Sequence, residues 1–171
     1  QISGAVLKDL KADGAKSTVT GDYYLLAVPL EVAAQLISPA LLKADASLQN
    51  IIKLAPNVEW MNGIQFYLTE PFDMHRGHTI YANSNWALTS ISQIQFWKDY
   101  DISSRFDGTV KGVLSVDISD WTKPGNFNKK AAQDCTLEEV KEEVWKQLKQ
   151  EINSSMGQEA LRDDMLRFVH L

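Results

Sequence analysis

The chain has 171 residues, a formal net charge of −5 and 44% hydrophobic residues, which are ordinary values for one globular domain with a core. The acidic balance argues against a nucleic-acid module, because neutralising phosphates needs clustered Lys and Arg. No window approaches about 18 uninterrupted apolar residues, so no transmembrane helix is expected. Peripheral contact with a membrane stays open.

The first elements predicted along the chain are three short strands. Residues 2–8 and 16–20 flank a turn at 13–14, Asp-Gly, which is a strong hairpin signal. Residues 22–28 are mostly apolar, as expected of a third strand that is covered on both faces. Pro29 should end this strand, because proline has no N–H to donate to a ladder.

Helical spacing of apolar residues begins directly after that proline. It continues from Leu30 to Ile37, and Ser38-Pro39 breaks it. Short helical pieces are expected at 39–43 and 47–54 before Pro56 ends the run.

A second sheet is predicted in the middle of the chain. Residues 58–69, 77–83 and 109–118 read as strands of one antiparallel sheet, and the last of them alternates apolar and mainly polar positions. Residues 83–97 fit neither the helical period nor the strand period.

The C-terminal part is predicted to be helical. Thr136 and Glu139 have the spacing of a capping box, and an apolar stripe follows as far as Ile152. A last helix is expected at about 157–169. The order of elements predicts an α+β fold, with a mixed, largely antiparallel sheet packed with helices and a small N-terminal β-meander.

Two groups of residues could carry chemistry, but the sequence favours an ordinary structural role for each. Asp73, His75 and His78 could suggest a metal, but Arg76 would repel a cation and the histidines lack helical i, i+4 spacing, so a polar loop is favoured. Cys135 precedes a helix N-terminus, which can lower a thiol pKa, but an incidental cysteine is commoner.

His170 is expected on a helix face. No catalytic, metal-binding or cofactor-binding residue is therefore assigned from the residues alone.

Aromatic residues concentrate between positions 60 and 97, in and around the second sheet. Ordinary core packing is one explanation. The sharper hypothesis is that one face lines a pocket for a bulky apolar ligand, because such pockets are mostly apolar with few polar groups. The candidate substrate-binding residues are Trp60, Gln65, Tyr67, Tyr81 and Trp86.

Several segments, taken in order, resemble one enzyme family. They read GDYYLLAVPLEVAAQLI, NVEWMNGIQFYL, NSNWALTSISQIQFW, VKGVLSVDISDWTKPG and CTLEEVKEEVWKQLKQEI. This order is similar to that of the FAD-dependent amine oxidase and phytoene desaturase superfamily, in its desaturase-like branch. That branch includes carotenoid desaturases and hydroxysqualene dehydroxylase.

The resemblance implies a division of the chain and a reaction. Residues 1–28 would be a remnant of the β-meander of the FAD-binding domain, and residues 29–171 would be the substrate-binding domain. The intact protein would transfer a hydride from its substrate to FAD. The family's N-terminal GxGxxG and C-terminal flavin-contacting motif are absent, so we expect this piece alone neither to bind FAD tightly nor to catalyse oxidation.

The ends of the chain and its cysteine content agree with a piece of an intracellular protein. Residues 1–7 read as a strand already under way, and residues 165–171 stop while still apolar. The lone Cys135 excludes an internal disulfide and favours a reducing, cytoplasmic setting.

Two rival interpretations stay open. One is a self-contained binding module for an apolar ligand, and the other is a protein-interaction domain. A carotenoid, another polyprenoid or an amine would all suit an aromatic-lined pocket.

Overall fold

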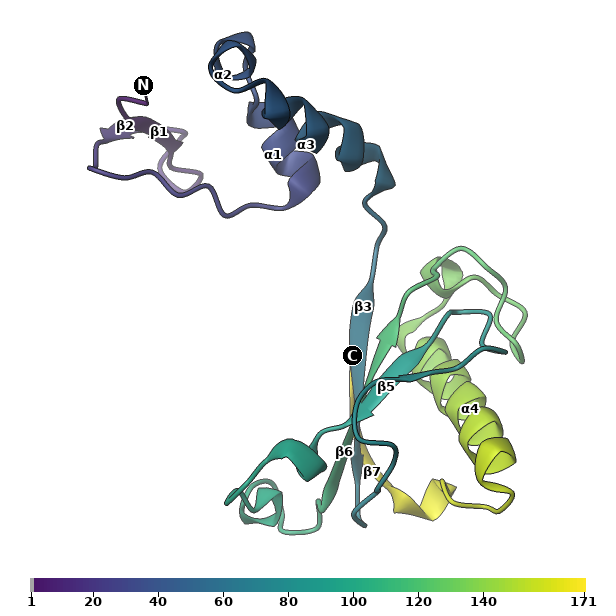
Figure 1. Cartoon of the computed structure of the whole chain (residues 1–171). Coiled ribbons are helices and arrows are strands. Elements are labelled where there is room, and N and C mark those ends of the chain that lie inside the picture. The colour runs from purple at the N-terminus through teal and green to yellow at the C-terminus, as the bar shows by residue number, and fades with distance from the viewer. Residues whose placement is uncertain (1) are drawn as a thin grey trace. The chain divides into compact units, whose positions relative to one another are not determined.

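The computed structural model of the chain describes residues 2–171. The chain divides into two compact units, one ending at Val58 and the other running from Glu59 to Leu171 (Figure 1). The expected boundary between 1–28 and 29–171 falls inside the first unit. A domain boundary there stays a prediction about a longer protein.

The first unit begins with the predicted hairpin. Strand β1 (Ala5–Lys8) pairs antiparallel with β2 (Lys16–Val19). The turn between them has left-handed φ angles of 46° at Asp13 and 75° at Gly14. Glycine adopts that region without steric cost and aspartate tolerates it, and the hairpin predicted from Asp-Gly is confirmed.

The third strand predicted at 22–28 is wrong. The segment makes no strand ladder in the described structure, and Tyr23 and Leu25 are 95% and 93% exposed. A strand needs a neighbouring backbone to satisfy its N–H and C=O groups, and neither strand of the hairpin supplies one here. Residues 22–28 are mostly apolar, but no other part of this unit that the structure describes buries their side chains.

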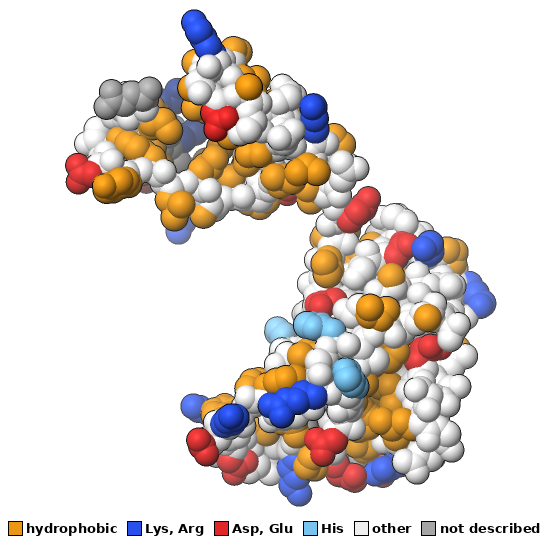
Figure 2. Space-filling view, in the orientation of Figure 1, with side chains coloured by type: hydrophobic (Ala, Val, Ile, Leu, Met, Phe, Trp, Pro, Cys, Tyr) orange, Lys and Arg blue, Asp and Glu red, His pale blue; other side chains and the backbone are white. Residues whose placement is uncertain are grey.

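The helices of the first unit are short. They are α1 (Leu30–Leu36), α2 (Pro39–Ala44) and α3 (Gln49–Leu54), and α1 packs against α3. Ser38 caps α2 by accepting a hydrogen bond from the N–H of Leu41 at 3.3 Å. Ala33 is the one buried side chain among residues 2–58, and hydrophobic side chains are spread over this unit's surface (Figure 2).

The second unit is built on a five-stranded antiparallel sheet, which confirms the α+β fold class. Its spatial order is β4-β5-β6-β3-β7. The strands are β3 (Asn62–Leu68), β4 (Thr79–Ile80), β5 (Thr89–Ser92), β6 (Gly112–Ile118) and β7 (Leu166–His170).

The strands predicted at 77–83 and 109–118 are shorter in the structure, and the second of them begins only at Gly112. The strand expected at 77–83 shrinks to β4, because a tight turn follows Tyr81 in which Ala87 has a φ of 49°. The ambiguous stretch 83–97 contains β5 and then a 3₁₀ turn at Ile94–Phe96.

Helix α4 (Leu137–Met156) covers one face of the sheet (Figure 1). The capping box is confirmed, since Thr136 and Glu139 exchange both hydrogen bonds, and Gly157 ends the helix with a φ of 65°. The apolar stripe packs into one core with the inward residues of β3 and β6: Val140, Val144, Leu148, Ile152, Ile64, Phe66, Leu68, Leu114, Val116 and Ile118.

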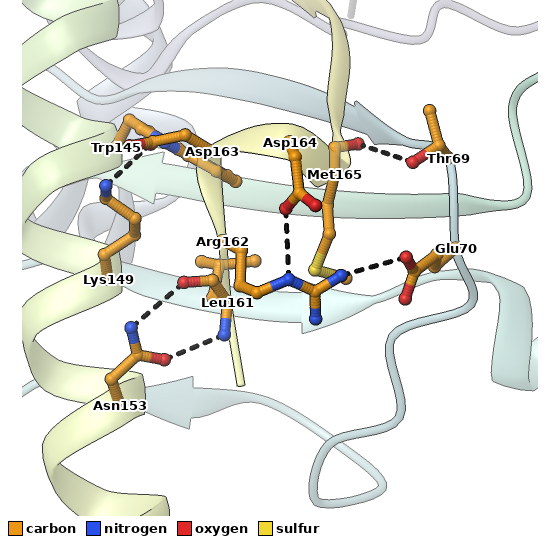
Figure 3. A network of polar contacts seen from close by, with 10 residues as sticks. All are labelled: Thr69, Glu70, Trp145, Lys149, Asn153, Leu161, Arg162, Asp163, Asp164 and Met165. Carbon is orange, nitrogen blue, oxygen red and sulfur yellow. Dashed lines mark hydrogen bonds and ion pairs between the residues drawn. The ribbon is translucent and has the colours of Figure 1, made fainter. Parts of the chain in front are cut away.

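The last helix predicted at 157–169 is wrong, because these residues form a turn and the edge strand β7. The side chain of Asn153 on α4 holds Leu161 by two hydrogen bonds, of 2.8 and 3.0 Å. The carbonyl of Met165 accepts from the N–H of Thr69 at 2.8 Å and from the Thr69 hydroxyl at 3.4 Å, and Figure 3 draws the second of these bonds. Pairing β7 with β3 satisfies backbone groups of β3 that a helix would leave without partners.

Candidate functional site

The two faces of the sheet have different roles. Along β3, Ile64, Phe66 and Leu68 are fully buried under α4, whereas Gln65 and Tyr67 point to the opposite side and are only partly buried. We call this opposite side the open face. Its residues follow from strand alternation and register.

Three rows of side chains cross the open face. The first row holds Val113, Tyr67 and Phe168, the second Ile91, Ser115, Gln65 and His170, and the third Thr89, Asp117 and Gly63. The rows therefore change from apolar to polar across the sheet.

The apolar row is partly covered by the segment that connects β5 to β6. Ile94 and Ile102 pack with Val113 and Tyr67. The ring of Phe106 lies 5.0 Å from that of Tyr67 and 5.8 Å from that of Phe168. These contacts form an aromatic ledge at one end of the open face.

The middle row contains a directed chain of hydrogen bonds. The hydroxyl of Tyr67 donates to Oε1 of Gln65 at 2.7 Å, and Nε2 of Gln65 donates to Oγ of Ser115 at 3.2 Å. The Ser115 hydroxyl is the acceptor in this bond, so its O–H group is free to donate a hydrogen bond to a ligand on the open face. The chain thus presents a donor at the centre of the open face.

The third row places a carboxylate beside that donor. Asp117 lies two residues after Ser115 on the same side of β6, with Gly63 opposite it on β3. A Cβ on Gly63 would lie 3.5 Å from Oδ1 of Asp117, so the glycine leaves the space over this carboxylate unfilled.

The five predicted substrate-binding residues occupy three different places. Gln65 and Tyr67 are brought together on the open face. Trp86 is fully buried on the α4 side, where its Nε1 donates to the carbonyl of Lys123 at 3.1 Å. Trp60 precedes β3, is 66% exposed and stacks on Trp121 with ring centroids 5.1 Å apart.

Tyr81 also lies on the α4 side. Its hydroxyl is 2.6 Å from Oγ of Ser90, and burial raises its pKa to about 12. A phenol with this pKa stays protonated and acts as a hydrogen-bonding group rather than as a base.

Two of the hollows outside the open face include predicted substrate-binding residues. One, of about 300 Å³, lies beside Trp60 and Trp121 and is lined also by Glu59, Ser119, Asp120, Thr122 and Gln133. The other, of about 290 Å³, includes the Tyr81 ring and residues near the end of α4.

Sequence reasoning missed Ser115, Asp117 and His170 as neighbours of Gln65 and Tyr67. The alternation of 109–118 already placed Ser115 and Asp117 on one side of a strand, and the missing information was which strand lies beside them. His170 was expected on a helix, but this segment forms strand β7, which places His170 opposite Gln65.

Cys135 does not have the surroundings of an activated nucleophile. Burial raises the pKa of its thiol, and its Sγ donates to the carbonyl of Ala131 at 3.3 Å. Within residues 2–171 no group of three or more His, Cys, Asp or Glu side chains is arranged to hold a metal.

No protein-family model, no curated protein and no solved structure matches this chain. Of the helices in the described residues, none has the length and apolar character needed to cross a membrane.

Proposed function

We propose that this chain is the substrate-binding portion of a FAD-dependent oxidoreductase of the amine oxidase and phytoene desaturase type. The complete protein transfers a hydride from a bulky, largely apolar substrate to flavin. Apart from the sequence resemblance, the observation that carries the proposal is the open face. One side of the sheet is used for the core, and the other presents an aromatic ledge beside an ordered polar row.

The open face suits a substrate that is mostly apolar and has one point for a hydrogen bond. The Phe106 and Phe168 rings offer contact to the apolar body. The Ser115 hydroxyl, aligned by Gln65 and Tyr67, can donate a hydrogen bond to the single polar group of the substrate. These residues bind and orient the substrate, and the flavin supplies the redox chemistry.

The residues described here do not fit a site for the flavin's phosphates. Such a site needs a glycine-rich turn between a strand and a helix. In this chain Val28-Pro29 leads into a helix of seven residues, and at the start of α4 the N–H groups of Thr136 and Glu139 each donate to the other's side chain. We therefore assign these residues to the substrate and none of them to the flavin.

The proposal extends to location. The lone Cys135 supports a cytoplasmic setting. Phe96, Trp97 and Tyr100 are exposed around Lys98, an arrangement suited to peripheral contact with a membrane surface. Co-sedimentation with anionic vesicles tests this contact, and a protein that stays in the supernatant contradicts it.

The substrate role is tested in the complete protein by steady-state kinetics. Ser115→Ala should lower kcat/KM by about tenfold, because one hydrogen bond to the substrate is lost. Tyr67→Phe should lower it less, because the phenol acts only through Gln65. The matched control is Ser103→Ala on an exposed turn, which should leave the kinetics unchanged. Equal kinetics in all three variants would contradict the assignment of the open face.

A further inference from the structure

We propose a second binding site on the α4 side of the sheet, which takes a small primary amine with an apolar body. It is the hollow of about 290 Å³ between the turn around β4 and the last turns of α4. It lies on the face opposite to Gln65 and Tyr67, so it does not rest on the proposed function.

The inner wall of this hollow is apolar. Met74, Ile152 and the Tyr81 ring belong to the core cluster or pack against it. The Tyr81 hydroxyl is already paired with Ser90, so the ring offers its carbon face to a ligand. Methionine adapts to irregular ligand shapes, and Met156 adds a second thioether at the rim.

The charged and titratable groups of this hollow are few. Glu151 is the one acidic residue and His75 the one basic residue that line it, and no Lys or Arg lines it in the described structure. Oε2 of Glu151 accepts one hydrogen bond from Asn83 Nδ2, at 3.1 Å, and no ion pair of the described residues involves Glu151. A partly buried carboxylate without a cationic partner favours a cationic ligand.

The remaining polar groups suit a primary ammonium. The Ser155 and Thr79 hydroxyls line the same hollow and can accept from its N–H groups. With the Glu151 carboxylate they give the hollow three acceptor groups, as many as a primary ammonium has N–H donors. A quaternary cation would leave these acceptors without donors, and an anion would be repelled by Glu151.

The size of the hollow sets the size of the ligand. A volume of about 290 Å³ accommodates a molecule of roughly ten heavy atoms, and ligands of this size bind with dissociation constants on the order of 1 mM. Phenethylamine is therefore a suitable probe. Phenethyl alcohol and 3-phenylpropionate are probes of similar shape without a positive charge.

The test is titration of the 171-residue chain with each probe, followed by amide NMR shifts and calorimetry. We expect phenethylamine to bind at least about tenfold more tightly than phenethyl alcohol, and 3-phenylpropionate not to bind. Shifts should centre on Tyr81, Ala82 and Glu151. Equal affinity for the three probes, or shifts centred elsewhere, would overturn the proposal.

Two variants and one control sharpen this test. Glu151→Gln should remove the preference for the amine while leaving the weak affinity for the alcohol. Ser155→Leu should reduce the affinity for both by filling the hollow, and it keeps the proposal testable should Glu151→Gln fold poorly. Glu138→Gln, at the opposite end of α4, makes the same change of charge and should keep the preference. An unchanged preference in Glu151→Gln would also overturn the site.

Discussion

Residues 2–58 are richer in apolar residues than residues 59–171, but they bury far fewer of them. In residues 59–171 the apolar side chains of β3, β6 and α4 meet in one core. In residues 2–58 only Ala33 is buried, and Leu10, Tyr23 and Leu25 are almost fully exposed. An apolar sequence pattern therefore predicts burial only where the chain also supplies the opposing surface.

The largest expected effect comes from separating the two units. Residues 59–171 alone should unfold cooperatively, with a Tm within about 3 °C of that of the whole chain, because the main core lies inside this unit. Residues 1–58 alone should give no cooperative transition. Calorimetry measures both. A fall of more than about 10 °C for residues 59–171 would show that the first unit contributes to that core.

A pair of leucine substitutions makes the same comparison within the whole chain. Leu148→Ala removes a fully buried side chain and should lower the free energy of unfolding by about 3–5 kcal/mol. Leu25→Ala removes an exposed one and should change it by less than about 0.5 kcal/mol. Urea unfolding measures both values, and similar losses would contradict the difference between the units.

A buried carboxylate gives a smaller effect. Glu143 is 2% exposed and accepts hydrogen bonds from the N–H groups of Phe127 and Asn128, at 2.9 and 2.8 Å. Glu143→Gln replaces one acceptor oxygen with a donor and should cost about 2–3 kcal/mol. Glu142→Gln, on the exposed side of the same helix, is the matched control and should cost under about 0.5 kcal/mol.

The smallest predicted effect depends on pH. Slight burial raises the pKa of Asp120, but hydrogen bonds from Lys123 and Thr122 outweigh it and lower the pKa to about 2. A lowered pKa stabilises the fold above pH 4, and this contribution disappears as the pH falls from 4 to 2. Asp120→Asn should therefore lower Tm by about 2 °C at pH 6 and by nothing near pH 2. A Tm difference that persists at pH 2 would contradict this origin.

The features predicted correctly from the sequence depend on residues that are close together along the chain. The capping box at Thr136 and Glu139 and the Asp13-Gly14 turn depend on residues within a few positions, and both were found. The failures at 22–28 and 157–169 depend on which backbone lies alongside. Residues 166–170 form a strand because β3 has a free edge, whereas residues 22–28 pair with neither strand of the β1-β2 hairpin.

The candidate site shows the same limit. Gln65 and Tyr67 were found because both lie on one predicted strand. Ser115 and His170 join them only through the pairing of β6 and β7 with β3, over separations that no local pattern encodes. Trp86 and Tyr81 carry the same aromatic signal but point to the α4 side, because they come from the turn after β4.

The central claim is that this chain binds the substrate of a flavoenzyme and that the flavin is held elsewhere. It is tested most directly by the visible absorption of two purified proteins, the 171-residue chain and the protein encoded by the gene with its flanking sequence. We expect stoichiometric FAD in the second and none in the first. Stoichiometric flavin in the 171-residue chain, or none in the encoded protein, would contradict the claim.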